Sequence, residues 1–427
     1  MVASAILKNR RALFISLSAL ASLLPAAQTN AEGYRISPPG AFNLGRAGGR
    51  IAQVDDSSAV QQNPANLVGP TNAEIQLAPG VIYFNAHFDS SAAPGQSAET
   101  KDPWNFIPNI FASMPLDNGK IALGFGASTP YGLGVHWNPN SSAFTPLTGV
   151  LRYTSPYDVN LKTINMNPSV AMKLFDDKLQ VGVGLDVMWS ELTFKEFYPW
   201  FMLVPGSPDG HVKLDGDGVG MGGNLGITWN ITDHQRLAVT YRSPIHIDYE
   251  GRTTIDNVPG GGTLSRSFST STTFPTIVAL GYGIELPHNV RLESDFEWLE
   301  YSHFKNLPIN TDPSLGLPNS APENWHNSFT IGIGGDWQFA DNWVLRAGYQ
   351  FYKSPIPDNN LTPSIPDANN NVFTIGLGYK HGHHAVEAAY GANFYDTRTV
   401  SHDVTPAFNG KYGVTVHLIS LAYHYSF

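Results

Sequence analysis

The 427-residue chain contains no cysteine, and only 14% of its residues are charged. Without cysteine it forms no disulfide and no thiolate site. It also lacks the repeated apolar runs of about 20 residues that a helical membrane protein requires, and its mean hydropathy is −0.15. Soluble domains carry about 25% charged residues. Low charge without long apolar runs, together with 12% aromatic residues and 41 glycines, predicts alternating apolar and polar residues, as in a transmembrane β-barrel.

The charge balance and the start of the chain indicate where the protein acts. The formal net charge is −10. An acidic chain lacks the basic patch that nucleic acid requires, so we expect no nucleic-acid partner. Basic residues precede a short apolar run at 12–24, and Thr29-Asn30-Ala31 provides a small-residue cleavage site. This order is typical of a secretory signal peptide. We therefore predict a signal peptide at 1–31 and export to the outer membrane of a Gram-negative bacterium.

The remaining chain alternates with the two-residue period of a β-strand. Near the C-terminus, Ile419, Leu421 and Tyr423 alternate with Ser420 and Ala422. Very short connections also alternate with long polar loops. The short connections lie near 117–119, 176–178, 232–234, 287–289, 340–342 and 382–383, and the long loops at about 89–104, 130–152, 196–212, 256–267, 306–325, 354–370 and 397–410. Six turns and seven loops predict fourteen antiparallel strands, with both chain ends on the short-turn side.

Residues 32–72 do not alternate and are rich in glycine, alanine, asparagine and aspartate. A segment of this length before the first strand predicts a compact plug inside the lumen, and we call it the plug segment. A disordered leader is the alternative that its composition leaves open. We therefore divide the chain into a signal peptide at 1–31, the plug segment at 32–72 and an all-β barrel at 73–427.

Short motifs along the mature chain resemble one known family. They are Leu44-Gly45-Arg46-Ala47, Asp55-Asp56-Ser57-Ser58, Asn63-Pro64-Ala65, Pro108-Asn109, Tyr131-Gly132-Leu133, Leu237 to Pro244, Asp341-Asn342-Trp343 and the terminal Phe427. In this order they are similar to the motifs of the FadL-type outer-membrane transporters, the OmpP1/FadL/TodX family. The resemblance implies a fourteen-stranded transmembrane barrel with an N-terminal hatch in its lumen, in agreement with the strand count from the loops.

The resemblance further implies passive transport of long-chain fatty acids or hydrocarbons. Such solutes cross the polar lipopolysaccharide leaflet poorly, and they gain little by entering a water-filled pore. In this family the ligand leaves sideways into the bilayer at a kink in the third strand. The candidate kink here is the segment 127–132, with Thr129, Pro130, Tyr131 and Gly132 as its gating residues, because proline removes a ladder donor and glycine weakens pairing. The alternative is that Pro130 only ends the third strand and begins its loop.

The same resemblance implies a binding pocket near the kink. Asn63, followed by Pro64 and Ala65, would face Thr129 across it. The Asn63 amide has donors and an acceptor for a carboxylate or for the kinked backbone. The alternative is that Asn63 only starts a turn in the plug segment, as Asn-Pro often does.

Cations in the lumen would suit a fatty-acid head group. The candidates are Lys195, Arg242, Lys305 and Arg346. Each has an alternative role, pairing with a lumen carboxylate. The carboxylates considered are Glu293, Asp295, Glu297 and Asp336. Asparagines stand at 369–371, where several members of the family carry a basic residue, and this leaves uncharged hydrocarbons open as cargo.

One long loop carries an unusually apolar stretch. It comprises Phe197, Tyr198, Trp200, Phe201 and Met202. We interpret it as part of an outer groove that gathers ligand, and an aromatic girdle at the membrane interface is the alternative.

No motif indicates chemistry. Three histidines at 381–384 occupy a tight turn and are interpreted as incidental, so we predict no metal site. Serine, histidine and aspartate have no hydrolase context, so we predict no cofactor and no enzymatic activity.

The sequence therefore predicts a monomeric outer-membrane barrel that moves hydrophobic small molecules inward by passive diffusion through a binding pocket. The expected partners are the hydrophobic substrate, outer-membrane lipid and lipopolysaccharide and, through Phe427, the barrel-assembly machinery. A general or sugar-selective porin is the first alternative, and an outer-membrane lipase or an adhesin is the second.

Overall fold

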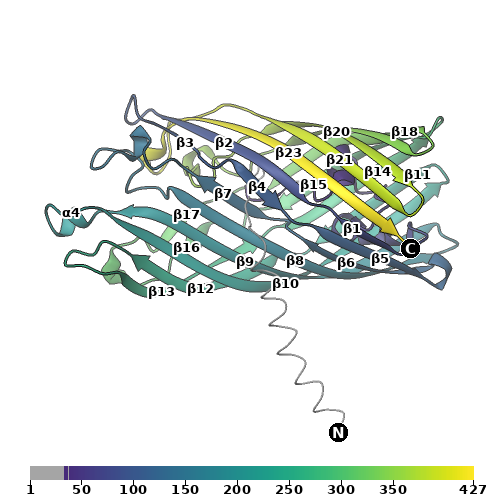
Figure 1. Cartoon of the computed structure of the whole chain (residues 1–427), viewed down its shortest axis with the longest axis horizontal. Helices are drawn as coiled ribbons and strands as arrows, with labels where there is room; N and C mark the ends of the chain where they lie inside the picture. The colour runs from purple at the N-terminus through teal and green to yellow at the C-terminus, as the bar shows by residue number, and fades with distance from the viewer. Residues whose placement is uncertain (1–32, 37) are drawn as a thin grey trace, which may run out of the picture.

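The computed structural model describes residues 33–36 and 38–427, and its strands form a closed antiparallel β-barrel around the described residues that precede β1 (Figure 1). The expected signal peptide at 1–31 lies outside the described residues. The barrel has fourteen strand positions, as predicted, and it closes where β23 pairs with β1 and β2. None of the helices in this part of the chain is long and apolar enough to cross a membrane.

The strands of the sheet cover most of the chain. They are β1 (Glu74–Leu77), β2 (Gly80–Ser90), β3 (Ser97–Glu99), β4 (Trp104–Ile107), β5 (Ile110–Leu116), β6 (Ile121–Ser128), β7 (Gly132–His136), β8 (Asp158–Leu174), β9 (Leu179–Tyr198), β10 (Gly210–Thr232), β11 (Gln235–Arg242), β12 (Ile245–Ile255), β13 (Leu264–Phe274), β14 (Thr276–Leu286), β15 (Val290–Glu300), β18 (Ser328–Ala340), β19 (Trp343–Tyr352), β20 (Asn370–His381), β21 (His384–Tyr395), β22 (Arg398–Val400) and β23 (Gly410–Ser426). A separate small ladder joins β16 (Asn306–Pro308) to β17 (Ser320–Pro322).

The helical elements are all short. The α-helices are α2 (Ala41–Arg46), α3 (Ala59–Gln62) and α4 (Trp200–Leu203), and the 3-10 turns are η1 (Pro64–Val68), η2 (Asp117–Gly119), η3 (Ser142–Phe144), η4 (Pro313–Leu315), η5 (Asp358–Asn360) and η6 (Pro406–Phe408). Of these, α2, α3 and η1 belong to the plug segment, and the others lie in connections between strands.

The short connections are tight turns because their residues tolerate left-handed backbone. Asn118, Asp177, Asn289 and Gly382 have φ values of 54°, 66°, 58° and 58°. Asparagine, aspartate and glycine adopt this conformation at least cost. The turns gather at one end of the barrel with the C-terminus, and α4 and the long loops gather at the other (Figure 1).

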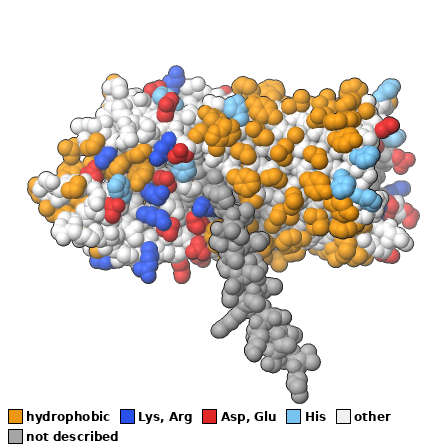
Figure 2. All heavy atoms as spheres, in the orientation of Figure 1, with side chains coloured by type: hydrophobic (Ala, Val, Ile, Leu, Met, Phe, Trp, Pro, Cys, Tyr) orange, Lys and Arg blue, Asp and Glu red, His pale blue; other side chains and the backbone are white. Residues whose placement is uncertain are grey.

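Side chains alternate across the barrel wall as the sequence predicted. On β23, Leu421 is 54% exposed on the outer face, whereas its neighbour Ala422 is 3% exposed on the lumen side. The outward apolar residues of neighbouring strands form a broad band, and charged side chains gather beyond it toward the loop end (Figure 2). A band of this kind suits the hydrocarbon layer of a bilayer.

The described residues of the plug segment pack against the inner face of the barrel wall. All residues of α2 and η1 are buried, and both elements contact barrel strands from inside. Glycines on the lumen face leave room for this packing: a side chain at Gly182 would collide with the Pro64 backbone, and one at Gly334 would collide with Arg46. The many lumen-facing glycines therefore allow backbone to approach backbone.

The third strand of the barrel is interrupted. Both β6 and β7 pair with β8, so they follow one line along the wall, but Thr129–Tyr131 between them leave the ladder. Four residues of β7, Gly132–Val135, are buried, whereas outward residues of the other strands are exposed. Strand three therefore continues beyond Pro130, contrary to the alternative that Pro130 only ends it.

Candidate functional site

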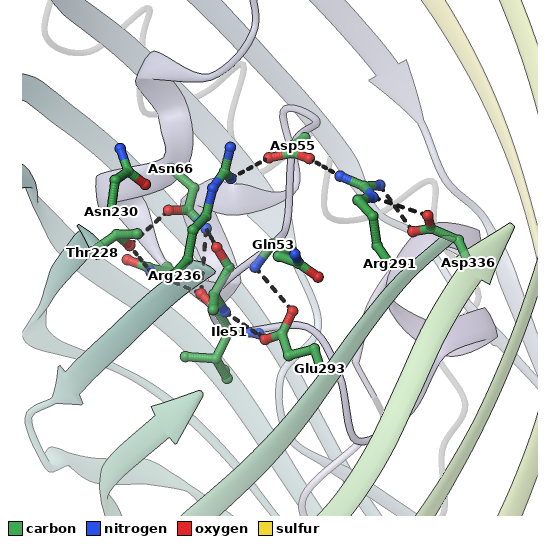
Figure 3. Close-up of polar contacts among 12 residues, drawn as sticks. Ile51, Gln53, Asp55, Asn66, Thr228, Asn230, Arg236, Arg291, Glu293 and Asp336 are labelled. Carbon is green, nitrogen blue, oxygen red and sulfur yellow. Dashed lines mark hydrogen bonds and ion pairs between the residues drawn. The ribbon is translucent and has the colours of Figure 1, made fainter. Parts of the chain in front are cut away.

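A buried network of charges fastens the plug segment to the wall (Figure 3). Glu293 on β15 accepts backbone N–H groups of Ile51 at 2.6 Å and Gln53 at 3.0 Å. It also accepts the Ala52 N–H and pairs with Arg46, whose guanidinium lies 3.4 Å from Glu293 and 3.0 Å from Asp336. The Arg46 and Glu293 side chains are fully buried. A buried charge is tolerated only when it is paired and hydrogen-bonded, so this network fixes the position of the plug segment.

Further ion pairs extend the network. Asp55 bridges Arg291 and Arg236, the latter at 3.0 Å, and Arg291 also reaches Asp336 at 2.9 Å. Glu297 binds both Arg35 and Arg50 of the plug segment. The sequence analysis considered Glu293, Glu297 and Asp336 as partners for barrel cations. In the structure these carboxylates pair largely with arginines of the plug segment.

The hydrogen bonds of Asn63 and Thr129 go to other residues rather than to each other. The Asn63 amide donates to Ile51 O at 2.8 Å and to Thr228 Oγ1 at 2.9 Å, and its oxygen caps η1 by accepting the Ala65 N–H. Thr129 N–H instead donates to Asn109 Oδ1 at 3.3 Å. Asn63, Pro64 and Ala65 thus shape the plug segment and bind it to β10, which is the structural alternative considered for Asn63.

The four candidate cations are dispersed. Arg242 pairs with Asp186 at 2.5 Å, Arg346 pairs with Glu387 at 2.7 Å, and Lys195 lies 3.4 Å from Asp158. Lys305 is exposed in a loop. Each of the first three is balanced by a carboxylate on the barrel wall, although not one of the four carboxylates that the sequence suggested.

A mostly apolar cavity lies at the loop end, and Tyr34 of the plug segment contributes to its lining. It measures about 320 Å³. Strands β8, β9 and β10 form one side with residues such as Leu161, Leu192 and Leu214, and long-loop residues such as Phe304 and Phe408 form the other. Its polar lining includes Glu196, Glu323, Asn360 and Asp403. We call it the loop-end cavity. None of Lys195, Arg242, Lys305 and Arg346 lines it.

The aromatic stretch that was interpreted as an outer groove contains both buried and exposed side chains. Phe197, Tyr198 and Trp200 are between 7% and 8% exposed. Tyr198 donates its hydroxyl to Leu315 O and Trp200 its indole N–H to Asp256 O. These side chains therefore hold long loops together. Met202 remains 66% exposed, and Phe201 is half-buried.

The interrupted third strand meets the plug segment from inside. Ile36 N donates to Pro130 O at 3.0 Å, and Gly132 N donates to Tyr34 O at 2.8 Å. These bonds flank an isolated antiparallel bridge between Arg35 and Tyr131. A cavity of about 50 Å³ beside this bridge is lined by Pro130, Tyr131 and residues of the plug segment.

One buried cluster has the composition of a metal site. Ligand atoms of Asp56, Glu387 and His424 lie within 4.8 Å of one another. His424 also lies 3.4 Å from Glu74, and Arg346 binds Glu387. The acidic groups therefore have cationic partners within the protein, and the geometry favours an ion-pair network that joins the plug segment to β21 and β23.

Glu323, a loop residue that lines the loop-end cavity, is a buried carboxyl with a raised pKa. Burial raises the pKa of the Glu323 carboxyl to about 8, although Trp325 donates its indole N–H to it. Because the pKa of Glu323 is higher in the folded loop than in the unfolded chain, protonation of this carboxyl stabilises the folded loop. This stabilisation is fully present below the ordinary pKa of 4.5 and is lost as pH rises through about 8. We expect protease cleavage of the long loops to accelerate as pH rises through this range. Glu323→Gln should flatten that dependence, and an unchanged profile would contradict this account.

The chain matches over residues 22–427 the family described as outer membrane protein transport protein (OMPP1/FadL/TodX). A long-chain fatty acid transport protein of Escherichia coli O6:H1 is 27% identical over 405 residues, which cover 85% of this chain and 87% of that protein. The crystal structure of a Pseudomonas aeruginosa FadL homologue superposes with a TM-score of 0.78 at 20% identity, covering 92% of this chain and 100% of the other.

The Ralstonia pickettii toluene transporter TbuX superposes with a TM-score of 0.72 at 19% identity, covering 93% of this chain and 99% of that one. The family resemblance, the barrel fold and the location in the outer membrane of Gram-negative bacteria are thereby confirmed. The chain belongs to the OMPP1/FadL/TodX family and is an outer-membrane transport protein, not an enzyme.

Proposed function

We propose that this transporter carries hydrophobic small molecules inward by passive diffusion, holding them in the loop-end cavity and releasing them sideways at the interrupted third strand. Long-chain fatty acids and hydrocarbons are the candidate cargo classes, since the relatives include a fatty acid transport protein and a toluene transporter. The observation that carries the proposal is a cavity of about 320 Å³ with a mostly apolar lining, to which Tyr34 of the plug segment contributes. Apolar solutes gain free energy by entering such a cavity from water.

A gap in the ladder supports the sideways exit. Among the described strands, β4 pairs only with β2, and β7 pairs only with β8. Two hydrogen bonds mark the ends of the gap between β4 and β7. Toward the loop end, Lys101 N–H donates to His136 O at 2.7 Å. Toward the short-turn end, Thr129 N–H donates to Asn109 Oδ1. In between, no ladder bond among the described strands must break for a solute to pass. Ile36 and Pro38 of the plug segment line a small cavity next to this gap, together with Ile107 at the end of β4.

Outer-membrane lipid would receive the solute directly. The apolar outer face of β4, with Trp104 60% exposed and Phe106 37% exposed, borders the gap.

At the other end of the barrel, Phe427 is 61% exposed, as a contact for the barrel-assembly machinery would require. We propose that the protein acts as a monomer, with lipopolysaccharide surrounding the loop end.

Leu192→Trp tests the role of the loop-end cavity. Leu192 is 6% exposed and points into the cavity from β9, so a larger ring there occupies the space of the solute. We expect uptake of labelled oleate or toluene by cells expressing this variant to fall to the level of cells without the protein. The measurement is accumulation of each label over the first minutes.

Leu185→Trp is the matched control. Leu185 lies on the same strand but on the opposite face, where it is 50% exposed, so the same substitution should leave uptake unchanged. Equal uptake by Leu192→Trp and Leu185→Trp, with both barrels present in the outer membrane, would remove the loop-end cavity from the pathway. Uptake that does not depend on the protein for either label would refute the transport proposal for both cargo classes.

A further inference from the structure

We propose that Asp56, Glu387 and His424 form a binding site for one zinc ion, which joins the plug segment to the barrel wall. We call this cluster the plug-wall site. It lies near the end of β23, at the short-turn end of the barrel (Figure 1). Without metal, the same residues form the ion-pair network described above. The inference does not depend on the cargo or on the loop-end cavity.

Two barrel strands and the plug segment position the three ligands. β21 and β23 pair Ala385 with His424, so Glu387, two residues further along β21, is a diagonal neighbour of His424 on the inner face. Asp56 approaches from the plug segment, where Ser58 N–H donates to Asp56 Oδ1 at 2.9 Å. The three ligand residues are between 4% and 8% exposed. Ligands carried by strands are held more precisely than ligands on free loops.

His424 is oriented as metal-binding histidines are. Its Nδ1 lies 3.4 Å from Glu74 Oε1, and its Nε2 faces Glu387 Oε2 at 3.6 Å. A carboxylate behind one ring nitrogen fixes the ring and leaves the other nitrogen for a metal. Arg346 binds the other oxygen of Glu387, Oε1, at 2.7 Å. Glu387 Oε2 itself has no hydrogen-bond partner among the described residues, although Glu387 is only 8% exposed.

The spacing of the ligand atoms fits one shared metal ion. Hydrogen bonds from nitrogen to oxygen end at about 3.2 Å, so the separation of 3.6 Å between His424 Nε2 and Glu387 Oε2 is too long for one. Two ligands of one tetrahedral zinc lie about 3.4 Å apart. All three ligand atoms lie within 4.8 Å of one another. A cavity of about 180 Å³, which all three residues line, leaves room for a water molecule as the fourth ligand.

The formal charges at the plug-wall site also favour a divalent ion. Three carboxylates meet here, those of Asp56, Glu74 and Glu387. Their cationic partners are Arg346 and protonated His424, so one negative charge of this group stays unbalanced. A zinc ion that replaces the His424 proton balances it, and the proton passes to water. Calcium and magnesium require more oxygen ligands than these side chains supply.

Zinc titration of the purified protein, without a histidine tag, tests the plug-wall site. The protein in lipid nanodiscs is stripped with EDTA and then titrated with Zn²⁺ in competition with a chromophoric chelator. We expect one tightly bound zinc per barrel and at least about tenfold weaker binding of Ca²⁺ and Mg²⁺. His424→Asn should weaken zinc binding about a hundredfold. Glu74→Gln, which removes only the group behind the ring, should weaken it about tenfold.

His383→Asn is the matched control. His383 is exposed at the turn before β21 and does not line the cavity, so its loss should leave the zinc affinity unchanged. Loss of tight binding in His383→Asn but not in His424→Asn would assign the zinc to surface histidines and refute the plug-wall site. Glu74→Gln keeps all three ligands and tests the site even where His424→Asn does not assemble. Unchanged zinc affinity in Glu74→Gln, or no tight binding by the wild-type protein, also refutes the site.

Protease protection tests whether the metal joins the plug segment to the wall. Asp56 is the ligand that the plug segment contributes, so saturating zinc should slow cleavage of this segment about tenfold in the wild-type protein and not in Asp56→Asn. Equal protection of both proteins would refute the joining role. Uptake of labelled oleate or toluene is measured separately, so failure of the proposed function and failure of the plug-wall site remain distinguishable.

Discussion

Replacing Glu293 with alanine is expected to convert a sealed barrel into an ion-conducting one. Glu293 holds consecutive backbone N–H groups of the plug segment from Ile51 to Gln53 and balances Arg46. Its loss leaves Asp336 as the carboxylate that still pairs with the buried Arg46. Removing one member of a buried ion pair costs about 3–5 kcal/mol, and here that cost falls on the attachment of the plug segment to β15.

The barrel itself should survive the change. Its ladder hydrogen bonds on both sides of β15 do not involve the Glu293 side chain. We therefore expect the variant to remain folded but to release or loosen the plug segment, whose attachment weakens by a factor of roughly a hundred or more. In planar lipid bilayers the wild-type protein should show no large steady conductance, and Glu293→Ala should show long open events.

Glu250→Ala is the matched control. Glu250 is also a glutamate on a barrel strand, but it is exposed on β12, so its loss should leave the barrel silent. Large steady conductance of the wild-type protein would favour the porin alternative over a sealed transporter. A silent Glu293→Ala variant in which the plug segment stays protected from proteases would show that the other ion pairs suffice to hold it.

The barrel could be predicted from the sequence because its determinants are local. Two-residue alternation decides which face of β23 meets lipid, and residues such as Asn118 and Gly382 mark the turns by their tolerance of left-handed backbone. The position of the break at Pro130 could also be predicted, because proline acts on the ladder at its own position.

The partners inside the lumen could not be predicted in the same way. Arg46 meets Glu293 across 247 residues of chain, and a charge pattern does not show which of several carboxylates a buried arginine reaches. The loop-end cavity is assembled by loops that are far apart in the sequence. The available signal was the presence of apolar residues such as Ile309 and Phe408 in otherwise polar loops, which indicates burial but not a cavity.

A reversible bridge between the plug segment and the interrupted strand should switch transport off and on. The variant is Arg35→Cys with Tyr131→Cys. Arg35 and Tyr131 face each other in the isolated antiparallel bridge. One hydrogen bond flanks the pair on each side, from Ile36 N–H to Pro130 O and from Gly132 N–H to Tyr34 O. This makes them a non-hydrogen-bonded antiparallel pair, the arrangement with the closest side chains and within disulfide reach.

The chain has no cysteine of its own, so oxidation can form only the designed bond. If solutes leave past Pro130 and Tyr131, the plug segment must separate from them, and the oxidised protein should transport no more than cells without it. Reduction should restore uptake in the same sample. Because the Arg35 to Glu297 ion pair is missing in both redox states, restored uptake assigns the block to the disulfide and not to the lost ion pair. Each single cysteine variant should be insensitive to oxidant. Full transport by protein that is shown by mass to be cross-linked would place the exit elsewhere, because a covalent tether at this point leaves the interrupted strand closed against the plug segment.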